Sequence, residues 1–473
     1  MKNITEVFKK ERNHPIRVLQ FGQGNFLRAF ADDFIDRLNE KCGFDGGVAV
    51  VKTTDRGDLS AFERQKGLYT VAYRGKGVCD NRIVSCLQTF VSTHTDPAGF
   101  FELAGEPELR FIISNTTEAG IALSENDSFQ GMPESYPAKL AKFLFLRYSR
   151  QCGEGGGVYV IPTELIEGNA ARLYKLVTEI SRRWGLEEGF FAWLDQECFF
   201  CESLVDRIVS GRPKEPVTDW EDELCDVCEP FGLWVIEEKG NIREEFPLEK
   251  AGVNAVFTDD VSLYRERKVR ILNGSHTSIA PLGLLLGKTT VKDCMDDPLM
   301  RKYLDTLQQR ALKPYVPLAP EEVERFIRDV NDRFDNPYLN HALISICLNS
   351  SSKFVSRLIP SLKDGAAATG SADGLIAFAF AALIRLYRVS RSDGAYVCRV
   401  GGREYRITDK PDTLEFFAGI ADLADEDYFT AAAKNAGIWG EDLRLIPGFE
   451  KAGLKAFCDI CRDPEAALRE AVK

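Results

Sequence analysis

The stretch of the chain that decides the fold is residues 16–28, which read IRVLQFGQGNFLR. Its first half is rich in β-branched and aromatic residues, which is typical of a strand. Two glycines follow, and apolar side chains then recur at helical spacing at Phe30, Phe34, Ile35 and Leu38. A strand, a glycine turn and a helix in this order predict a loop where a dinucleotide pyrophosphate meets backbone N–H groups.

The loop departs from the usual dinucleotide fingerprint, because Leu27 stands where a third glycine is expected. The pattern alone therefore leaves a simple strand–helix turn as the alternative. A second strand, residues 48–51, is followed by Lys52 and Asp55. Asp55 is placed to hold the ribose hydroxyls of NAD, whereas Lys52 and the neighbouring Arg56 suit the 2′-phosphate of NADP. A solvated loop is the alternative for each of these three residues.

Strands and helices alternate further along the chain. Residues 109–113 and 158–161 are short apolar strands, and residues 138–148 and 170–184 have helical patterns. This alternation predicts an α/β fold with a mostly parallel, Rossmann-like sheet. From about residue 258 the patterns are largely helical, with one hairpin over residues 396–407. We therefore predict a dinucleotide-binding domain over residues 1–258 and a helical catalytic domain over residues 259–473.

Composition excludes several kinds of partner. The net charge of −12 argues against nucleic acid, because phosphate binding needs a basic surface. The longest apolar run has ten residues, 375–384, and a membrane helix needs roughly 20. The first residues lack the apolar core of a secretory signal. We expect a cytoplasmic enzyme with no membrane partner.

The chain has 13 cysteines, an odd number that is typical of reduced thiols in a cytosolic protein. Three Cys-x-x-Cys pairs occur, and the first two, Cys198/Cys201 and Cys225/Cys228, have the spacing of zinc-ribbon halves. Because the first pair lies in an apolar run without a turn-forming glycine, buried thiols are favoured over zinc. We predict no metal.

Residues 267–277, RKVRILNGSHT, bring together Lys268, Asn273 and His276. In an α-helix with about 100° per residue, Lys268 and Asn273 lie about 140° apart with His276 between them. All three then line one side of a cleft. Spacing alone leaves open the alternative that the lysine is solvated and the histidine is structural.

Together with the glycine loop, these residues resemble the mannitol dehydrogenase family, the polyol-specific long-chain dehydrogenases. Lys268, Asn273 and His276 match the family signature of Lys, four residues, Asn, two residues, His. Residues 22–28 are similar to its Gly-x-Gly-x-Phe-x-Arg loop, which accounts for the absent third glycine. Residues 117–120, TEAG, and 204–208, LVDRI, resemble two further family motifs. The resemblance extends from residue 16 to beyond residue 357.

The resemblance implies metal-free hydride transfer with NAD (NADH). Lys268 is then the general base in alcohol oxidation and the general acid in ketone reduction. Asn273 donates a hydrogen bond to the developing alkoxide, and Asn169 is the choice for a second donor. His276 and Asp206 are expected to bind substrate hydroxyls. The expected cofactor-binding residues are Gly22, Gly24, Asn25, Phe26, Arg28, Asp55, Asn115, Thr117 and Glu118.

Other stretches resemble the branch of the family that reduces tagaturonate to altronate: residues 162–166, 272–277, 336–338 with His341, and 345–350 with Lys353. Mannitol dehydrogenases carry an arginine where this chain has Ser345. A hexuronate needs a cation for its carboxylate, and Lys353 and Arg357 are the candidates. A surface ion pair is the alternative for Arg357, and helix packing is the alternative for His341.

The sequence therefore predicts an NADH-dependent reductase of a small sugar acid, acting as a monomer or small homo-oligomer. Reduction of fructuronate, or of another ketose by a polyol or mannitol-type dehydrogenase, remains the alternative. Two rivals of another class are a dinucleotide-binding sensor without catalysis and a zinc-dependent module. The intact set of Lys268, Asn273 and His276 argues against a sensor, which has no use for a proton-transfer lysine.

Overall fold

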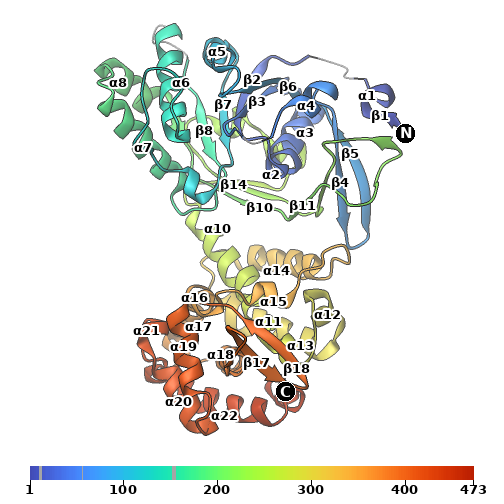
Figure 1. The fold of residues 1–473 in the computed structure, drawn as a ribbon, viewed down its shortest axis with the longest axis vertical. Coiled ribbons are helices and arrows are strands. Elements are labelled where there is room, and N and C mark those ends of the chain that lie inside the picture. The colour runs from blue at the N-terminus through green and yellow to red at the C-terminus, as the bar shows by residue number, and fades with distance from the viewer. Residues whose placement is uncertain (10–12, 56, 152–155) are drawn as a thin grey trace. The chain divides into compact units, whose positions relative to one another are not determined.

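The computed structural model describes residues 1–9, 13–55, 57–151 and 156–473. The chain forms two compact units, Met1–Val261 and Ser262–Lys473 (Figure 1). The first unit contains a parallel sheet with helices, and the second is largely helical. The predicted fold class is therefore confirmed. The boundary predicted at residue 258 lies next to the division between the units.

The first unit is built around a six-stranded sheet with the order β6-β3-β2-β7-β8-β9, in which all neighbours are parallel. Helices cover both faces, so the central strands are buried along their length and read as continuous apolar runs. The carboxyl ends of parallel strands meet at one edge, where ligands bind in such sheets. The strands are β2 (Ile16–Phe21), β3 (Gly47–Lys52), β6 (Leu87–Ser92), β7 (Phe111–Ser114), β8 (Tyr159–Pro162) and β9 (Phe199–Phe200).

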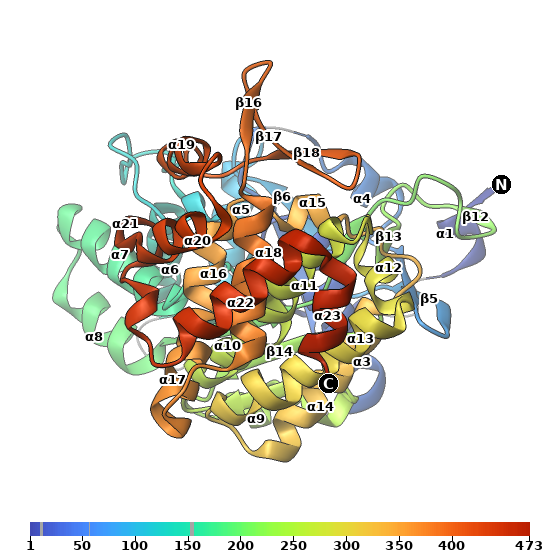
Figure 2. The same ribbon diagram turned by 90° about the horizontal axis from the view of Figure 1, so that it is seen from below.

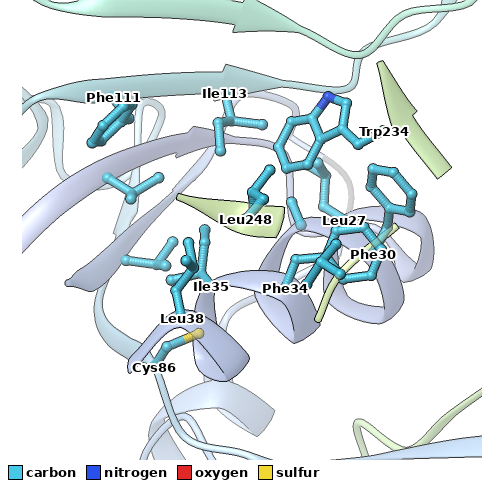
Figure 3. Packing of buried hydrophobic residues seen from close by; sticks show 14 of the residues in the cluster. Leu27, Phe30, Phe34, Ile35, Leu38, Cys86, Phe111, Ile113, Trp234 and Leu248 are labelled. Atoms are coloured by element: carbon cyan, nitrogen blue, oxygen red, sulfur yellow. The ribbon is translucent and has the colours of Figure 1, made fainter. Parts of the chain in front are cut away.

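One face of this sheet is covered by the helix that follows the glycine loop. It runs through α2 (Asn25–Leu27), a π-helical turn (Arg28–Asp32) and α3 (Asp33–Cys42) without leaving helical backbone angles. Leu27, Phe30 and Phe34 gather around Trp234, as Figure 3 shows. Four helices pack on the other face: α5 (Pro97–Glu102), α6 (Tyr136–Gln151), α7 (Asn169–Arg183) and α8 (Glu188–Glu197).

Among the described residues, three smaller sheets complete the first unit, in the orders β11-β13-β4-β5, β10-β14-β15 and β1-β12. Their strands are β1 (Lys2–Asn3), β4 (Tyr69–Gly75), β5 (Val78–Val84), β10 (Ser203–Asp206), β11 (Val209–Gly211), β12 (Trp220–Glu221), β13 (Asp226–Cys228), β14 (Leu233–Glu237) and β15 (Ala255–Thr258). The remaining helices are α1 (Ile4–Val7), α4 (Ser60–Arg64) and α9 (Ile242–Glu245).

The second unit is centred on α11 (Gly274–Leu285) and α18 (Gly374–Leu386). Both are apolar on nearly all sides and buried, as expected of helices inside a bundle. Helices α11 and α22 (Phe449–Arg462) both pack against α18, and Figure 2 shows the three helices close together. The other helices are α10 (Ser262–Arg267), α12 (Val291–Asp296), α13 (Pro298–Thr306), α14 (Pro320–Phe334), α15 (Leu343–Ile346), α16 (Ser350–Arg357), α17 (Ile359–Thr369), α19 (Pro411–Ile420), α20 (Asp425–Lys434), α21 (Ala436–Trp439) and α23 (Pro464–Ala471).

The predicted hairpin is confirmed in the second unit. Strands β17 (Ala395–Val400) and β18 (Arg403–Ile407) pair antiparallel around Gly401 and Gly402, and β16 (Ser390–Ser392) adds to β17. Within the described ranges, no helix is both long and apolar enough to cross a lipid bilayer.

The paired cysteines of the first unit are buried free thiols: Cys198, Cys201, Cys225 and Cys228. Burial raises the pKa of each of these thiols to about 12, which makes a thiolate ligand unfavourable. In the part of the chain that the structure describes, no group of three or more His, Cys, Asp or Glu is arranged to hold a metal ion.

Candidate active site

The glycine loop lies at the carboxyl edge of the main sheet, between β2 and α2. Gly22 has a φ of 122°, and a Cβ there would lie 3.1 Å from Leu27 Cδ1 and 3.4 Å from Asn115 O. Gly24 precedes α2 in extended conformation, with no side chain capping the helix and open space where a Cβ would be. The first N–H groups of the helix are thereby left for a ligand, and a helix N-terminus favours an anion.

A cavity of about 610 Å³ opens beside this loop, within the first unit. Of the predicted cofactor residues, Gly22, Gly24, Asn115 and Thr117 line it. The carboxyl end of β3 contributes Lys52, Thr53 and Thr54, and the start of α6 contributes Tyr136 and Lys139. Such a cavity, with strand ends on one side and a helix N-terminus on the other, has the arrangement that binds a dinucleotide.

Three predicted cofactor residues, Arg28, Asn25 and Phe26, are not among the residues that line the cavity. Arg28 is 7% exposed and donates to Gln23 O at 2.7 Å and Asn25 Oδ1 at 2.9 Å. It also pairs with the buried Asp226 at 2.8 Å. The structure thus corrects the prediction for Arg28, which shapes the loop from beneath and does not line the cavity. Asn25 accepts from Arg28, and Phe26 stacks on Phe30 with ring centroids 4.9 Å apart. Both residues stand at the uncapped start of α2, and their contact with the cofactor stays a prediction.

Asp55 and Glu118 remain predictions. Asp55 is exposed and follows Thr54, the last residue of the β3 edge that lines the cavity. Lys52, the alternative contact for a 2′-phosphate, donates a hydrogen bond from its ammonium to Thr54 O and so holds this edge. Glu118 starts a 3-10 turn, Glu118–Gly120, and its side chain lies outside the described part of the structure.

Glu164 fixes the segment that carries Asn115. It is buried just after β8, where its carboxylate accepts from Thr116 N at 2.8 Å, Thr116 Oγ1 at 3.0 Å and Ser114 Oγ at 3.1 Å. Burial raises the pKa of Glu164, and these donors oppose that effect. The Asn115 amide donates to Thr163 Oγ1 at 2.9 Å. The run at 162–166 therefore supports one wall of the cavity from behind.

Asn169 has no hydrogen-bond donor left for a substrate. Its amide nitrogen lies within 3.1 Å of Pro162 O, 3.1 Å of Glu164 O and 2.9 Å of Ser203 O, and the residue is fully buried. Its Oδ1 accepts from Ala170 N and Ser203 N. An amide has two N–H groups. The prediction of Asn169 as a second alkoxide donor is therefore wrong, because the residue binds backbone at the start of α7.

The LVDRI motif divides into two roles. Asp206 is the last residue of β10 and is 6% exposed, and its contact with a substrate hydroxyl stays a prediction. Arg207 lies beneath α3, where it donates to Ala29 O at 2.6 Å and pairs with Asp33 at 2.9 Å. Arg207 thus ties the helix of the glycine loop to β10, which explains an arginine in the motif without any chemical role.

In the second unit, Lys268 and Asn273 are the first and last residues of a π-helical turn, Lys268–Asn273, between α10 and α11. The N–H of Gly274 reaches back five residues to Val269 O. In this register, residues five apart lie about one turn apart on the same side. This corrects the expected separation of about 140°, which assumed α-helix. His276 follows three residues after Asn273 in α11, so all three side chains share one side of the helix.

The two arginines near Lys268 form ion pairs with acidic residues. Arg267 pairs with Glu322 at 2.8 Å, and Arg270 pairs with Asp364 and Glu266, each at 2.5 Å. Lys268 itself is half-buried at the start of the turn.

His276 lies in a pocket of aromatic and cationic residues. Its ring stacks on Phe334 with centroids 4.2 Å apart and meets the edge of His341 at 4.9 Å. Burial lowers the pKa of His276 well below its usual range, and His341, Arg333, Arg357 and Lys353 lower it further. Its Nε2 is buried without a hydrogen-bond partner among the described residues. A neutral ring with one open nitrogen is suited to bind a substrate hydroxyl.

Lys353 and Arg357 lie on α16, four residues apart and therefore on one side of that helix. Lys353 donates to Ile346 O at 2.9 Å, and Arg357 donates to Thr277 Oγ1 at 3.1 Å. Burial lowers the pKa of both groups. Within the residues that the structure describes, neither side chain forms an ion pair. A partly buried cation is normally paired, so this pair has the character of a binding site for an external anion.

Sequence reasoning missed several residues that the structure places here. Tyr136 and Lys139 line the dinucleotide cavity at the start of α6, and Arg333 on α14 lies near His276. None of them lies within a motif that signals a site, because their roles depend on which elements pack together. His341 lies beside His276, where the two rings meet edge to face, and its predicted contact with the substrate stays a prediction.

A parallel dinucleotide-binding sheet and a helical unit carrying lysine, asparagine and histidine define a two-unit dehydrogenase. Comparison with known families agrees. Residues 16–250 match the mannitol dehydrogenase Rossmann domain, and residues 260–450 match the mannitol dehydrogenase C-terminal domain. The chain belongs to the mannitol dehydrogenase family, whose members are oxidoreductases acting on CH–OH groups.

Individual proteins are similar over nearly the whole chain. The altronate oxidoreductases of Escherichia coli strain K12 and of E. coli O157:H7 (strain EC4115 / EHEC) are each 36% identical over 479 residues, covering 97% of both chains. Among solved structures, substrate-free D-sorbitol dehydrogenase has a TM-score of 0.81 at 19% identity, with 100% of both chains covered. Pseudomonas fluorescens mannitol 2-dehydrogenase, in complex with NAD and D-mannitol, has a TM-score of 0.64 at 22% identity, covering 97% of this chain and 94% of that one. The structural likenesses bear on the fold alone.

Proposed function

We propose that the protein reduces D-tagaturonate to D-altronate with NADH, reversibly, in the cytoplasmic catabolism of hexuronates. The observation that carries this proposal is the pair Lys353 and Arg357, two partly buried cations that form no ion pair within the described residues. A hexuronate supplies the carboxylate that this pair lacks, whereas a neutral polyol does not. The likeness to altronate oxidoreductases supports the same substrate.

The first unit fits a nicotinamide dinucleotide. Gly22 and Gly24 leave room for the pyrophosphate at an uncapped helix N-terminus, and the adjoining cavity is lined by Asn115 and Thr117. When bound, NADH supplies the hydride. The exposed Asp55 is the proposed contact for the ribose hydroxyls, which favours NADH over NADPH.

The second unit supplies the proton and stabilises the charge. Lys268 donates a proton to the substrate oxygen as the carbonyl becomes an alcohol, and it accepts that proton in the reverse direction. Asn273, on the same side of the π turn, donates a hydrogen bond to this oxygen while it carries negative charge. With a lysine for the proton and an amide for the oxyanion, the proposed mechanism uses no metal ion.

Substrate hydroxyls bind beside this centre. His276 stays neutral because its surroundings lower its pKa, so its open Nε2 binds a hydroxyl and does not compete with Lys268 for the transferred proton. His341 is proposed to hold the substrate from beside His276. In the first unit, Asp206 is proposed as a further contact for a substrate hydroxyl. Lys353 and Arg357 then bind the carboxylate at the far end of the sugar acid.

The test is a panel of substrates with purified protein. NADH and NADPH are each offered with tagaturonate, fructuronate and fructose, and the loss of reduced cofactor is followed spectroscopically. We expect the highest kcat/KM with NADH and tagaturonate. Turnover of fructuronate or fructose without turnover of tagaturonate contradicts the proposal.

A further inference from the structure

Helix α16, which carries Lys353 and Arg357, begins without a cap of its own. The residue before it, Asn349, has left-handed backbone angles (φ 53°, ψ 41°), and its side chain caps no N–H group. The first N–H groups of a helix have no partner within the helix and need an acceptor from elsewhere.

A distant carboxylate supplies that acceptor. Asp409, which lies 58 positions after Ser351 and between β18 and α19, accepts from Ser351 N at 3.0 Å and from Ser351 Oγ at 2.8 Å. Beside it, Thr408 O accepts from Asn349 N at 3.0 Å. The start of α16 is thus bound at two successive points to the segment after the hairpin.

Asp409 is itself held firmly. The residue is 8% exposed, and its carboxylate also accepts from Lys410 N at 2.7 Å and from the Tyr387 hydroxyl at the end of α18. Each carboxylate oxygen therefore accepts two hydrogen bonds, which satisfies a buried carboxylate and fixes its orientation. Its negative charge also interacts favourably with the positive end of the helix dipole at the N-terminus of α16.

We propose that Asp409 is a positioning residue for the substrate carboxylate, because it fixes the start of α16 and with it the placement of Lys353 and Arg357. The inference rests on the proposed function, in which these two cations bind a sugar acid. Nothing in the residue pattern around Asp409 signals such a role, since the contact joins segments far apart in the chain.

Besides fixing the position of α16, Asp409 acts on Lys353 through its charge. Burial and Arg357 lower the pKa of the Lys353 ammonium, whereas Cys347 and Asp409 raise it. The charge of Lys353 in turn lowers the pKa of two histidines, His276 and His341. Removal of the Asp409 charge therefore lowers the pKa of Lys353, so that the ammonium loses its proton at a lower pH.

The experiment compares Asp409→Asn with the wild-type full-length protein. The amide keeps the size of the side chain but loses the charge and replaces one acceptor oxygen with a donor. We expect the KM for tagaturonate to rise about tenfold, in line with the loss of one charge-assisted hydrogen bond. We expect kcat and the KM for NADH to stay near wild type. The alkaline rise in the KM for tagaturonate should also move to lower pH.

Asp373→Asn is the matched control, because Asp373 caps α18 in the same unit by accepting from Leu375 N at 2.7 Å. In the described structure it contacts neither Lys353 nor Arg357. It should leave the KM for tagaturonate and its pH profile unchanged. Tyr387→Phe removes one donor from Asp409 but keeps its charge. It should raise this KM by a smaller factor without moving the pH profile, and it serves as the test if Asp409→Asn does not fold.

The outcomes separate cleanly. Suppose that the wild-type protein turns over tagaturonate and Asp409→Asn has the same KM and pH profile. That result overturns this inference and leaves the proposed function standing. If Asp409→Asn does not fold, an unchanged KM in Tyr387→Phe has the same meaning. A loss of kcat in Asp409→Asn that Asp373→Asn matches assigns a merely structural role and also overturns it. Wild-type protein that does not turn over tagaturonate overturns the proposed function and this inference together.

Discussion

Arg357→Met removes one of the two cations proposed to bind the substrate carboxylate, while it keeps an unbranched side chain of similar reach. In the described structure Arg357 forms no ion pair, and its one hydrogen bond is to Thr277 Oγ1 at 3.1 Å. The guanidinium is therefore available to a carboxylate, and the substitution should act mainly on substrate binding.

The expected magnitude follows from that geometry. A hydrogen bond to a charged group contributes about 1.5–3 kcal/mol, so its loss should lower kcat/KM for tagaturonate by about 10- to 150-fold. The change should appear mainly in KM, because the carboxylate is remote from the reacting carbon and is bound alike in ground and transition states. Loss of the bond from the charged guanidinium to Thr277 should cost about 1.5 kcal/mol in the free energy of unfolding.

The assay is the initial rate of NADH oxidation over a range of tagaturonate concentrations. Arg328→Met is the control, since Arg328 lies on α14 with its side chain 63% exposed and forms a long ion pair of 3.9 Å with Glu324. An Arg357→Met enzyme with the kcat/KM of wild type would refute the reasoning. So would a loss that appears in the KM for NADH and not in that for tagaturonate.

Three further substitutions test other parts of the site. Lys268→Ala should lose turnover by several orders of magnitude while NADH still binds, as measured by protein-to-cofactor fluorescence transfer; near-normal turnover would remove Lys268 from the mechanism. Gly22→Ala places a Cβ at a φ of 122° and 3.1 Å from Leu27 Cδ1, so it should lower the free energy of unfolding in denaturant. The expected loss is about 1–3 kcal/mol, and Gly24→Ala, with open space for its Cβ, should show none. Burial raises the pKa of Asp32 from 3.8 to about 7, so the folded chain keeps a proton that the unfolded chain loses, and the free energy of unfolding falls as pH rises across this interval. Asp32→Asn should remove that part of the slope, and an unchanged slope would show that Asp32 is ionised in the fold.

Much of the fold was predictable from local pattern. Apolar strands, the glycine loop and helical repeats report burial one segment at a time, and they placed the parallel sheet, the helical unit and the hairpin correctly. The signature of Lys268, Asn273 and His276 could also be recognised from the sequence, because its three members are close together in the chain. The π turn was not readable, since an i→i+5 register leaves no distinct composition.

Side-chain partners account for the errors. Arg28 and Asn169 stand in motifs that suggest contact with a ligand, yet each binds another part of the protein. Arg28 forms an ion pair with Asp226, and Asn169 forms hydrogen bonds with backbone groups. Whether a polar side chain faces a ligand or the interior depends on which segments pack against it. Sequence spacing carries no information about those segments.

The sequence by itself determined the order of the elements, the dinucleotide loop and the three residues of the proposed chemistry. Those features depend on local periodicity and on residue types a few positions apart. Only the tertiary structure decided that Lys268 and Asn273 share one side of a helix, that Lys353 and Arg357 lack an anionic partner in the described chain, and that Asp409 holds their helix. These depend on backbone register and on contacts between distant segments, which form only when the chain has packed.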